Sequence, residues 1–345
     1  MKEDEIYMHR CIQLARNGLC GAAPNPMVGA VIVCDGMIIG EGYHAKCGEA
    51  HAEVNAIRSV KNQELLKRST IYVSLEPCAH YGKTPPCADL IVEKQLKRVV
   101  VGCQDPFAKV DGKGIEKLRQ AGIEVTVGVL EKECLELIER FVTYHARKRP
   151  FITLKWAQSE DGFIDLNRTA GEPVKLSNDF TSMLVHKRRA EHDAILVGTR
   201  TALLDNPSLN VRNWYGKSPL RLVIDRNLTL PSHLKLFDGS QPTILFTAQR
   251  KENLHHVEYV TLDFSQPILP QIVEVLHARK IQSLLVEGGA MLHQSFIAEN
   301  LWDEAFVEVA PIALGSGVKS PSLPDEMLVE TKKVNGHVIR RYKRK

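Results

Sequence analysis

The spacing of apolar residues in the first 150 positions predicts alternating strands and helices. Short apolar runs are typical of buried strands, and we expect strands at residues 28–33, 71–75, 99–101 and 125–129. The stretches between them have apolar residues at helical spacing, and they predict helices that begin at residue 52 and cover residues 88–95, 114–121 and 131–144. This βαβ rhythm is typical of a three-layer α/β domain.

The second half of the chain repeats the alternation with new elements. Apolar runs predict strands at residues 151–156, 194–197, 220–224, 243–246, 283–286 and 305–310. One helix is expected to be capped near Ser177 and Asn178 and to end at Glu191, and a second to cover residues 291–298. The second half is therefore also expected to be α/β, and it is not an internal repeat of the first half.

A domain boundary is expected at Lys148-Arg149-Pro150. Proline in a helix loses a hydrogen bond, so the helix before Pro150 should end there. A chain of 345 residues exceeds the usual size of one hydrophobic core, and all eight cysteines lie before residue 150. We expect one domain at residues 1–149 and a second of different chemistry at residues 150–345.

Composition and charge narrow the classes of protein. Hydrophobic residues make up 44% and charged residues 25%, as in soluble globular proteins, and no apolar run is long enough for a membrane span. The N-terminus is acidic and does not resemble a signal peptide, so we expect the protein to be located in the cytoplasm. A net charge of +4 does not indicate a nucleic-acid partner, and the basic tail from Arg340 is interpreted as a solvated end. A homo-oligomer is left open.

The strongest local signal is a set of zinc-ligand types. His51 is followed by Pro77-Cys78 and, after eight intervening residues, by Cys87. Catalytic zinc commonly takes three nitrogen or sulfur ligands and leaves a fourth position for water. Prolines directly precede both cysteines and favour rigid turns that could present the thiolates. His51, Cys78 and Cys87 are therefore predicted to hold one zinc ion.

Glu53 is the candidate catalytic residue beside this set. It stands two positions after His51, at the start of a predicted helix. Zinc lowers the pKa of a bound water to roughly 7, and a neighbouring carboxylate can then act as general base and general acid. Zinc nucleobase deaminases use a related H-x-E…P-C-x-x-C pattern, with two residues between the cysteines instead of eight.

A closed, structural zinc site is the alternative interpretation. Such a site normally needs four protein ligands, and Cys47 or His80 could supply the fourth. This alternative leaves Glu53 and the paired prolines without a role. It corresponds to a zinc-stabilised binding protein that has no catalytic activity.

Further motifs resemble one enzyme family closely. They are Asn25-Pro26-Met27-Val28-Gly29, His51-Ala52-Glu53, the stretch from Leu75 to Cys87 with its widened cysteine pair, and Gly102-Cys103-Gln104-Asp105-Pro106. The chain resembles the bifunctional deaminase/reductase of riboflavin biosynthesis over nearly its whole length. The resemblance implies an N-terminal cytidine-deaminase-like domain and a C-terminal dihydrofolate-reductase-like domain.

For the first domain, the resemblance implies deamination of a phosphorylated pyrimidine. The substrate would be 2,5-diamino-6-(ribosylamino)pyrimidin-4-one 5′-phosphate, whose 2-amino group is replaced by oxygen with release of ammonia. The positions that match the family's substrate contacts are Asn25, His44, Lys83 and Asp105. An asparagine can offer a donor and an acceptor to a heterocycle, and a lysine offers a point charge to a phosphate.

The second half lacks the G-x-G-x-x-G fingerprint of dinucleotide-binding proteins. Instead, a predicted strand runs into Glu287-Gly288-Gly289-Ala290 and then a helix, an arrangement that suits a cofactor phosphate. By the resemblance, this domain uses NADPH to reduce the ribosyl group to ribityl. The implied cofactor contacts are Thr201, Asp205, Gly288, Gly289 and Ser295. The implied substrate contacts are Arg189, Leu209, Arg212 and Glu287.

Two departures from the family pattern keep alternatives open. Glu160 stands where many members have leucine, and residues 165–174 show no clear family pattern, so no contacts are predicted around Gln158 and Lys175. A working deaminase with a silent reductase-like domain is one alternative. A deaminase of the cytidine or tRNA-adenosine type is another, although such enzymes seldom carry a reductase-like domain. From spacing alone, Arg189 would be one more charge on a solvated helix face.

Overall fold

The computed structural model describes residues 2–81, 85–105 and 112–344. Within these residues the chain forms two compact units, Met1–Lys148 and Arg149–Lys345. Among the described helices, none has the length and hydropathy that a membrane span requires. Short 3-10 helices occur at Arg16–Gly18, Gln63–Arg68, Lys235–Phe237 and Asp325–Met327.

The first unit contains a five-stranded sheet with the order β2-β1-β3-β4-β5. β1 pairs antiparallel with both β2 and β3, whereas β3, β4 and β5 run parallel to one another. The strands are β1 (Gly29–Cys34), β2 (Met37–Tyr43), β3 (Thr70–Leu75), β4 (Arg98–Cys103) and β5 (Glu124–Val127). The carboxyl ends of β3 and β4 therefore lie at the same edge of the sheet.

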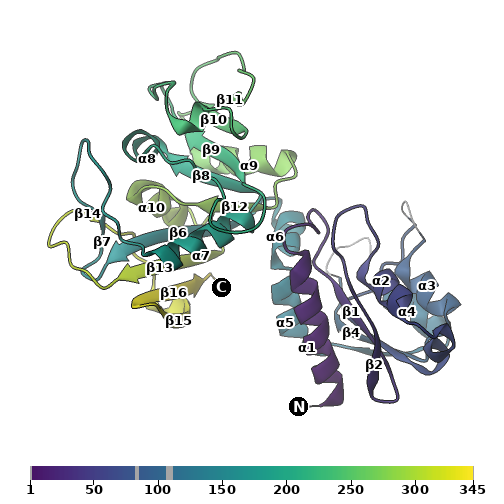
Figure 1. Cartoon of the computed structure of the whole chain (residues 1–345). Helices are drawn as coiled ribbons and strands as arrows, with labels where there is room; N and C mark the ends of the chain where they lie inside the picture. The colour runs from purple at the N-terminus through teal and green to yellow at the C-terminus, as the bar shows by residue number, and fades with distance from the viewer. Residues whose placement is uncertain (1, 82–84, 106–111, 345) are drawn as a thin grey trace. The chain divides into compact units, whose positions relative to one another are not determined.

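Helices cover both faces of this sheet, which makes the unit a three-layer domain (Figure 1). One face packs against α1 (Glu3–Ala15) and α5 (Glu131–Leu137). The other face packs against α2 (Ala52–Ser59), α3 (Cys87–Glu93) and α4 (Lys113–Gln120). The expected three-layer α/β fold of this half is confirmed.

Three details of the first unit differ from the sequence expectation. α1 and β2 were not predicted, and the helix expected over residues 131–144 is divided at Ile138 into α5 and α6 (Glu139–Arg147). β2 contains two glycines and is largely exposed at its start, so it presents no continuous apolar run. Ile138 adopts φ −104° and ψ 12°, outside the helical region, and this interrupts the helix.

The second unit is built on a nine-stranded sheet with the order β11-β10-β9-β8-β12-β6-β13-β16-β15. Neighbouring strands from β11 to β13 are parallel, and β16 is antiparallel to both β13 and β15. The strands are β6 (Phe151–Ser159), β8 (Ala194–Gly198), β9 (Leu220–Ile224), β10 (Thr243–Thr247), β11 (Val257–Thr261), β12 (Ser283–Val286), β13 (Glu304–Ala310), β15 (Leu328–Val334) and β16 (His337–Lys343). A small ribbon pairs β7 (Phe163–Asp165) with β14 (Val318–Lys319).

Apolar clusters lie on both faces of the nine-stranded sheet. α9 (Ile268–Ala278) and α10 (Ala290–Ala298) contribute to the larger cluster. α8 (Thr199–Asp205) contributes to the cluster on the opposite face. α7 (Asp179–Ala190) reaches β13, where the guanidinium carbon of Arg188 lies 3.1 Å from the ring centre of Phe306. The α/β architecture expected for the second half is confirmed.

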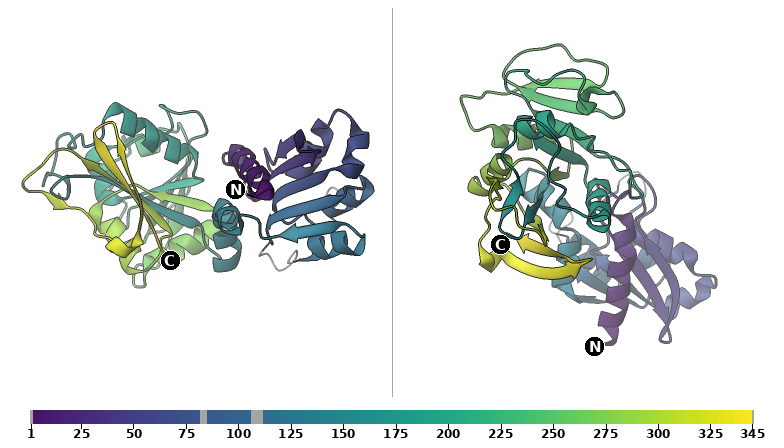
Figure 2. Two further views of the ribbon diagram at one scale, coloured as in Figure 1. Left: turned by 90° about the horizontal axis from the view of Figure 1, so that it is seen from below. Right: turned by 60° about the vertical axis from the view of Figure 1, so that its left-hand side comes forward.

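The basic C-terminal stretch is not a solvated end, contrary to the sequence interpretation. Residues 337–343 form β16, which lies between β13 and β15 and forms a hairpin with β15 (yellow in Figure 2). Tyr342 is buried, and Arg341 donates to the carboxylate of Glu304. The strand contains the apolar residues Val338, Ile339 and Tyr342 beside its basic residues, so its charge alone was a misleading guide to exposure.

A buried ion pair fixes the beginning of the second unit. The two Nη atoms of Arg149 donate to the two carboxylate oxygens of Asp303 at 2.6 and 2.7 Å. Asp303 also accepts from the backbone N–H of Ile152 at 2.8 Å. The side chains are only 8% and 7% exposed, so the contact anchors β6 to the segment before β13.

We predict that Asp303→Asn lowers the free energy of unfolding of the second unit by about 3–5 kcal/mol, because it leaves the buried Arg149 charge without its counter-ion. All three tryptophans, Trp156, Trp214 and Trp302, lie in this unit, so urea unfolding followed by tryptophan fluorescence reports it. Glu258→Gln, which breaks the exposed pair with Arg279, is the matched control and should cost less than about 1 kcal/mol. Equal costs for the two variants would contradict the prediction.

Candidate active sites

Three predicted zinc ligands come together at one edge of the first sheet. His51 is the residue directly before α2, Cys87 is the first residue of α3, and Cys78 lies in the loop that follows β3. Their ligand atoms all lie within 4.8 Å of one another. Both helices direct their N-terminal ends toward this cluster, where the helix dipole favours thiolate charge.

The spacing of these atoms fits a tetrahedral metal ion. Nδ1 of His51 lies 3.6 Å from Sγ of Cys78 and 3.4 Å from Sγ of Cys87. Zinc bonds of about 2.3 Å to sulfur and about 2.0–2.1 Å to nitrogen, at a tetrahedral angle, place the ligand atoms about 3.5 Å apart. Within the described ranges, neither Cys47, His80 nor another His, Cys, Asp or Glu joins the cluster. The donor set is therefore that of a three-ligand zinc site.

The two thiols titrate very differently. The Cys87 thiol and the backbone N–H of Cys87, which lies 3.3 Å from Sγ of Cys78, donate to Cys78 and lower the pKa of that thiol. The same thiol contact and burial raise the pKa of Cys87. The lowered pKa favours the thiolate form of Cys78, and binding of zinc to Cys87 requires the Cys87 thiol to lose its proton.

Glu53 lies in the first turn of α2, beside the metal-ligand cluster. Its side chain is 3% exposed, and it interacts with the Cys87 thiol. Burial, together with the negative charge of Cys78, raises the pKa of Glu53 to about 7, although His51 opposes the shift. A carboxyl group with this pKa can exchange a proton near neutral pH.

Asn25 and His44 are hydrogen-bonded to each other beside the cluster. Nδ1 of His44 lies 3.1 Å from the carbonyl oxygen of Ala50 and must donate to it, which leaves Nε2 as the acceptor for Nδ2 of Asn25 at 3.1 Å. Burial lowers the pKa of His44, in keeping with this neutral tautomer. The His44 ring stands edge-on to that of His51, with centroids 5.4 Å apart. The structure thus brings these two predicted substrate residues to the metal site.

The other two predicted substrate residues differ in what the structure describes. Asp105 lies two residues after the end of β4, and its backbone N–H donates to the Glu76 carboxylate at 3.2 Å. Lys83 lies outside the described residues. The sequence analysis missed Asn55, whose side-chain amide donates to the carbonyl groups of Tyr43 and Ala50 and holds the loop that carries His44.

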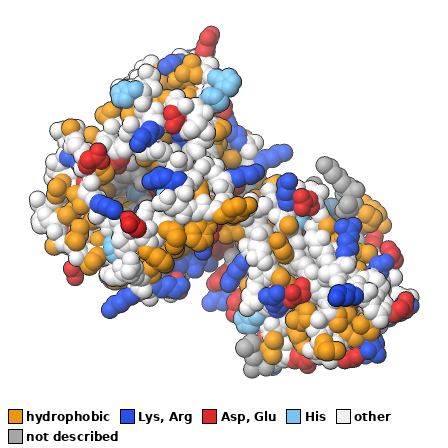
Figure 3. Space-filling view, in the orientation of Figure 1, with side chains coloured by type: hydrophobic (Ala, Val, Ile, Leu, Met, Phe, Trp, Pro, Cys, Tyr) orange, Lys and Arg blue, Asp and Glu red, His pale blue; other side chains and the backbone are white. Residues whose placement is uncertain are grey.

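The second unit contains a cavity of about 1100 Å³ at the carboxyl ends of its parallel strands. Figure 3 shows side chains of both charges around a hollow in the surface of this unit. All five predicted cofactor residues line the cavity: Thr201, Asp205, Gly288, Gly289 and Ser295. The volume is sufficient for a dinucleotide-sized ligand.

Two of these residues are glycines for a steric reason. A Cβ atom at Gly288 would lie 2.9 Å from the Val197 side chain and 3.1 Å from that of Thr201. Gly289 adopts φ +75°, a backbone conformation that side-chain-bearing residues rarely adopt. The backbone between β12 and α10 can therefore approach both α8 and a ligand closely. This closeness, at a helix N-terminus, is the geometry that suits a phosphate.

Arg189 is not on a solvated face, contrary to what spacing alone suggested. Its guanidinium binds the Glu287 carboxylate through two hydrogen bonds of 3.0 and 2.6 Å, and it also donates to the carbonyl of Asn210. Burial tends to raise the pKa of Glu287, but the charge and hydrogen bonds of Arg189 outweigh it and lower the pKa. Glu287 lines the cavity as an ionised group held in one orientation.

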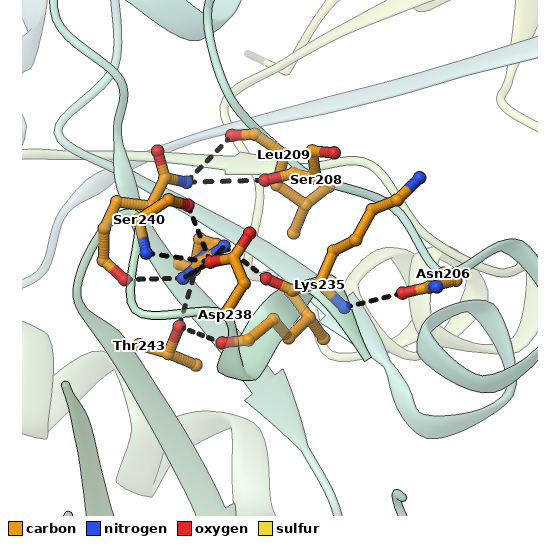
Figure 4. Close-up of polar contacts among 10 residues, drawn as sticks. Asn206, Ser208, Leu209, Lys235, Asp238, Ser240 and Thr243 are labelled. Carbon is orange, nitrogen blue, oxygen red and sulfur yellow. Dashed lines mark hydrogen bonds and ion pairs between the residues drawn. The ribbon is translucent and has the colours of Figure 1, made fainter. Parts of the chain in front are cut away.

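The loop that carries Leu209 and Arg212 is held by a network of polar contacts (Figure 4). Asn206 accepts from the backbone N–H of Lys235 at 2.7 Å, and the fully buried Arg221 binds Asp238 and the Gln241 carbonyl. Leu209 is buried and has φ +51°, a strained conformation for leucine. Neither Leu209 nor Arg212 lines the cavity. Both arginines donate to Asn210, however: Arg212 to its side-chain oxygen and Arg189 to its backbone carbonyl.

The structure adds residues that the sequence analysis missed. Lys155, on β6, lines the cavity with Glu287, and burial lowers its pKa against the pull of the Glu287 and Glu308 charges. Arg168 binds both Asp165 and Asp205, so the segment without a family pattern forms part of the cavity wall. A lysine in an apolar strand was the available signal for Lys155; no comparable signal marked Arg168.

Glu160, the residue that departs from the family pattern, lies outside the cavity of the second unit. Its side chain is exposed and does not line the cavity. The neighbouring Asp161 accepts hydrogen bonds from the backbone N–H groups of Leu314 and Gly315. The turn is therefore held by Asp161, and the substitution at position 160 gives no structural support for a silent reductase domain.

Comparisons with known proteins match both units. Residues 1–103 match the family described as the cytidine and deoxycytidylate deaminase zinc-binding region. Residues 150–341 match the RibD C-terminal domain family. The chain is 40% identical to the riboflavin biosynthesis protein RibD of Aquifex aeolicus, over 96% of this chain and 93% of that protein. It is also 40% identical to RibD of Bacillus amyloliquefaciens, over 93% and 87% of the two chains.

Solved structures agree over the whole chain. A diaminohydroxyphosphoribosylaminopyrimidine deaminase/5-amino-6-(5-phosphoribosylamino)uracil reductase from Thermotoga maritima is 38% identical, with a TM-score of 0.89 over 99% of this chain and 98% of that one. RibD from Acinetobacter baumannii is 32% identical, with a TM-score of 0.86 over the same shares. The similarity includes both units in the same order along the chain.

We predict that Cys78→Ser and Cys87→Ser each reduce bound zinc from one ion per chain to near zero, because each removes a thiolate from a three-ligand site. Metal content after dialysis, measured by inductively coupled plasma mass spectrometry, provides the test. Cys47→Ser is the matched control, since Cys47 is exposed and outside the cluster. Loss of zinc from the control would indicate a closed four-ligand site.

The pKa of Glu53 also predicts a pH dependence for the metal-free protein. A carboxyl whose pKa rises from 4.5 to about 7 on folding stabilises the fold fully below pH 4.5, and this contribution is lost as the pH rises toward 7. Between those pH values, wild type should lose up to about 3 kcal/mol relative to Glu53→Gln. Urea unfolding followed by circular dichroism after chelation measures it. Glu116→Gln, at an exposed position, should instead follow wild type.

Proposed function

The chain belongs to the RibD family of riboflavin-biosynthesis proteins. On that premise we propose which residues carry out each of its two reactions. It is a zinc-dependent deaminase and an NADPH-dependent reductase. We assign the deaminase to residues 1–149 and the reductase to residues 150–345. The observation that carries the first assignment is the tetrahedral spacing of His51, Cys78 and Cys87 beside the buried Glu53.

The deaminase substrate is proposed to be 2,5-diamino-6-(ribosylamino)pyrimidin-4-one 5′-phosphate, the kind of compound named for the Thermotoga maritima enzyme. His51, Cys78 and Cys87 hold the zinc ion. Zinc bound there lowers the pKa of a water ligand and so supplies a nucleophile at neutral pH. The Glu53 carboxylate accepts a proton as oxygen adds at C2 and returns it to the departing amino group. Ammonia and the corresponding aminouracil are the products.

Asn25 and His44 are proposed to orient the pyrimidine ring. Because His44 is neutral and accepts from Asn25, the Asn25 carbonyl oxygen is directed to accept from an exocyclic amino group. The fixed His44 tautomer keeps the asparagine from rotating by 180°. Asp105 is proposed to contact the substrate and Lys83 its phosphate, as the family resemblance implies.

The reductase assignment rests on the cavity of the second unit. Gly288 and Gly289 let the backbone approach the cofactor phosphates, while Thr201, Asp205 and Ser295 line the same wall. NADPH supplies the hydride that converts the ribosyl group to ribityl. Glu287, held by Arg189, presents an ionised carboxylate to the sugar hydroxyl groups, and the exposed Arg212 is proposed to bind the substrate phosphate. Leu209 is proposed as a further substrate contact, as the family resemblance implies.

We further propose that the protein acts in the cytoplasm on free small molecules, without a nucleic-acid or membrane partner. Among the described residues, seven cysteines form no disulfide bond, which fits a reducing compartment: Cys11, Cys34, Cys47, Cys78, Cys87, Cys103 and Cys134. The net charge of +4 is too small to favour nucleic acid. Association into a homo-oligomer is compatible with both sites lying within one chain.

We predict that Glu53→Gln lowers kcat of ammonia release from the diaminopyrimidine phosphate by about 10²–10⁴-fold, because the amide cannot carry the proton. Zinc should stay at one ion per chain. Ammonia is measured in a coupled assay, and NADPH oxidation is measured separately with the deaminated product supplied.

The second measurement separates the two halves of the proposal. The variant should oxidise NADPH as fast as wild type when given the deaminated product, since Glu53 belongs to the other unit. Cytidine should release no ammonia with either protein. Unchanged ammonia release by the variant would overturn the role of Glu53, and absence of NADPH oxidation by wild type would overturn the reductase assignment.

A further inference from the structure

Glu76 is a buried carboxylate that no step of the proposed reaction uses. It follows β3 directly and precedes Pro77 and the metal ligand Cys78. Its side chain is 4% exposed, so its charge has little access to solvent. Burying an ionised carboxylate is costly unless hydrogen bonds compensate it.

Four backbone N–H groups supply that compensation. One oxygen of Glu76 accepts from Gly114 at 2.8 Å and Ile115 at 3.3 Å, and the other accepts from Gly112 at 3.0 Å and Asp105 at 3.2 Å. Gly112, Gly114 and Ile115 lie at the N-terminal end of α4, where N–H groups have no partner within the helix. Glu76 therefore caps α4 from a different segment of the chain and at the same time fixes the backbone of Asp105.

The main chain around Glu76 connects the same carboxylate to the metal site. Leu75, the last residue of β3, pairs with Cys103, the last residue of β4. The next residue, Glu76, extends this pairing, because its backbone N–H donates to the Cys103 carbonyl at 3.0 Å. A Cβ atom at Gly114 would lie 2.0 Å from the Pro77 carbonyl oxygen, so α4 packs directly against this segment. Cys78 is in turn held by the N–H of Ala88, which donates to its carbonyl at 3.1 Å.

We infer that Glu76 is a positioning residue of the deaminase site, which sets the place of Asp105 relative to the zinc ligand Cys78. The inference rests on the substrate role proposed above for Asp105. We assign Glu76 no contact with zinc or substrate. Its carboxylate instead holds together the end of β3, the end of β4 and the beginning of α4. A carboxylate is required because all four contacts are N–H donors, and an amide would turn its own NH₂ group toward two of them.

Glu76→Gln tests this requirement with almost no change in volume. It should raise KM of the deaminase about tenfold, through misplaced Asp105, while kcat stays within about twofold of wild type because Glu53 and the zinc ligands are untouched. Zinc should stay at one ion per chain. The reductase reaction, measured with the deaminated product, should be unchanged and serves as the control within the same chain.

Two further variants separate positioning from stability and from the proposed function. Leu118→Ala removes a fully buried side chain of α4 without touching Glu76, and it should leave KM unchanged. Asp105→Ala should raise KM by itself, and combining it with Glu76→Gln should add little, since both changes act through one residue.

Each outcome is decisive. If Asp105→Ala leaves KM unchanged, the proposed substrate role of Asp105 fails, and the inference fails with it. If Asp105→Ala raises KM but Glu76→Gln does not, only the inference fails. Loss of zinc or of the folded first unit in Glu76→Gln, or an equal rise of KM in Leu118→Ala, would make Glu76 a purely structural residue and overturn the inference.

Discussion

The deaminase site depends on one geometric constraint: three ligand atoms from three separate segments must meet at tetrahedral spacing. His51 precedes one helix, Cys87 begins another, and Cys78 follows a central strand. Parallel strands make this convergence simple, because their carboxyl ends and the helix N-termini that follow lie at one edge of the sheet. Sγ of Cys78 accepts a hydrogen bond there from the backbone N–H of Cys87, and the helix dipoles favour negative charge, so the backbone contributes to the site's electrostatics.

Much of this site could be predicted from the sequence because its chemistry is local. His51 and Glu53 are two residues apart, and each cysteine follows a proline, so residue type and spacing carry the information. Strong apolar runs likewise predicted the central strands. Two of the features that were missed have weak patterns: β2 begins with exposed residues and contains two glycines, and the break at Ile138 depends on one backbone conformation. The basic tail was misinterpreted because its charge suggested exposure to solvent, whereas pairing with β13 and β15 places it within the sheet.

The reductase site was less predictable because its contacts are distant in sequence. The Gly288-Gly289 turn is visible as a pattern between a strand and a helix. The pairing of Arg189 with Glu287 joins residues 98 positions apart. Arg168, which contacts Asp165 and Asp205, lies in a segment without a recognisable motif. No local rule distinguishes such an arginine from a solvated one. The family resemblance predicted that Arg189 matters, and the structure gives the physical reason, a buried counter-ion.

Three buried glutamates show how surroundings decide what a carboxylate can do. Glu287 faces the Arg189 guanidinium, and its pKa is lowered, so it stays charged and suits binding. Glu76 faces four N–H donors, which satisfy an ionised carboxylate and fix the backbone around it. Glu53 is buried beside the negative charge of Cys78, and these surroundings raise its pKa to about 7. Glu53 can therefore gain and lose a proton near neutral pH, and proton transfer is assigned to it, substrate binding to Glu287 and positioning to Glu76.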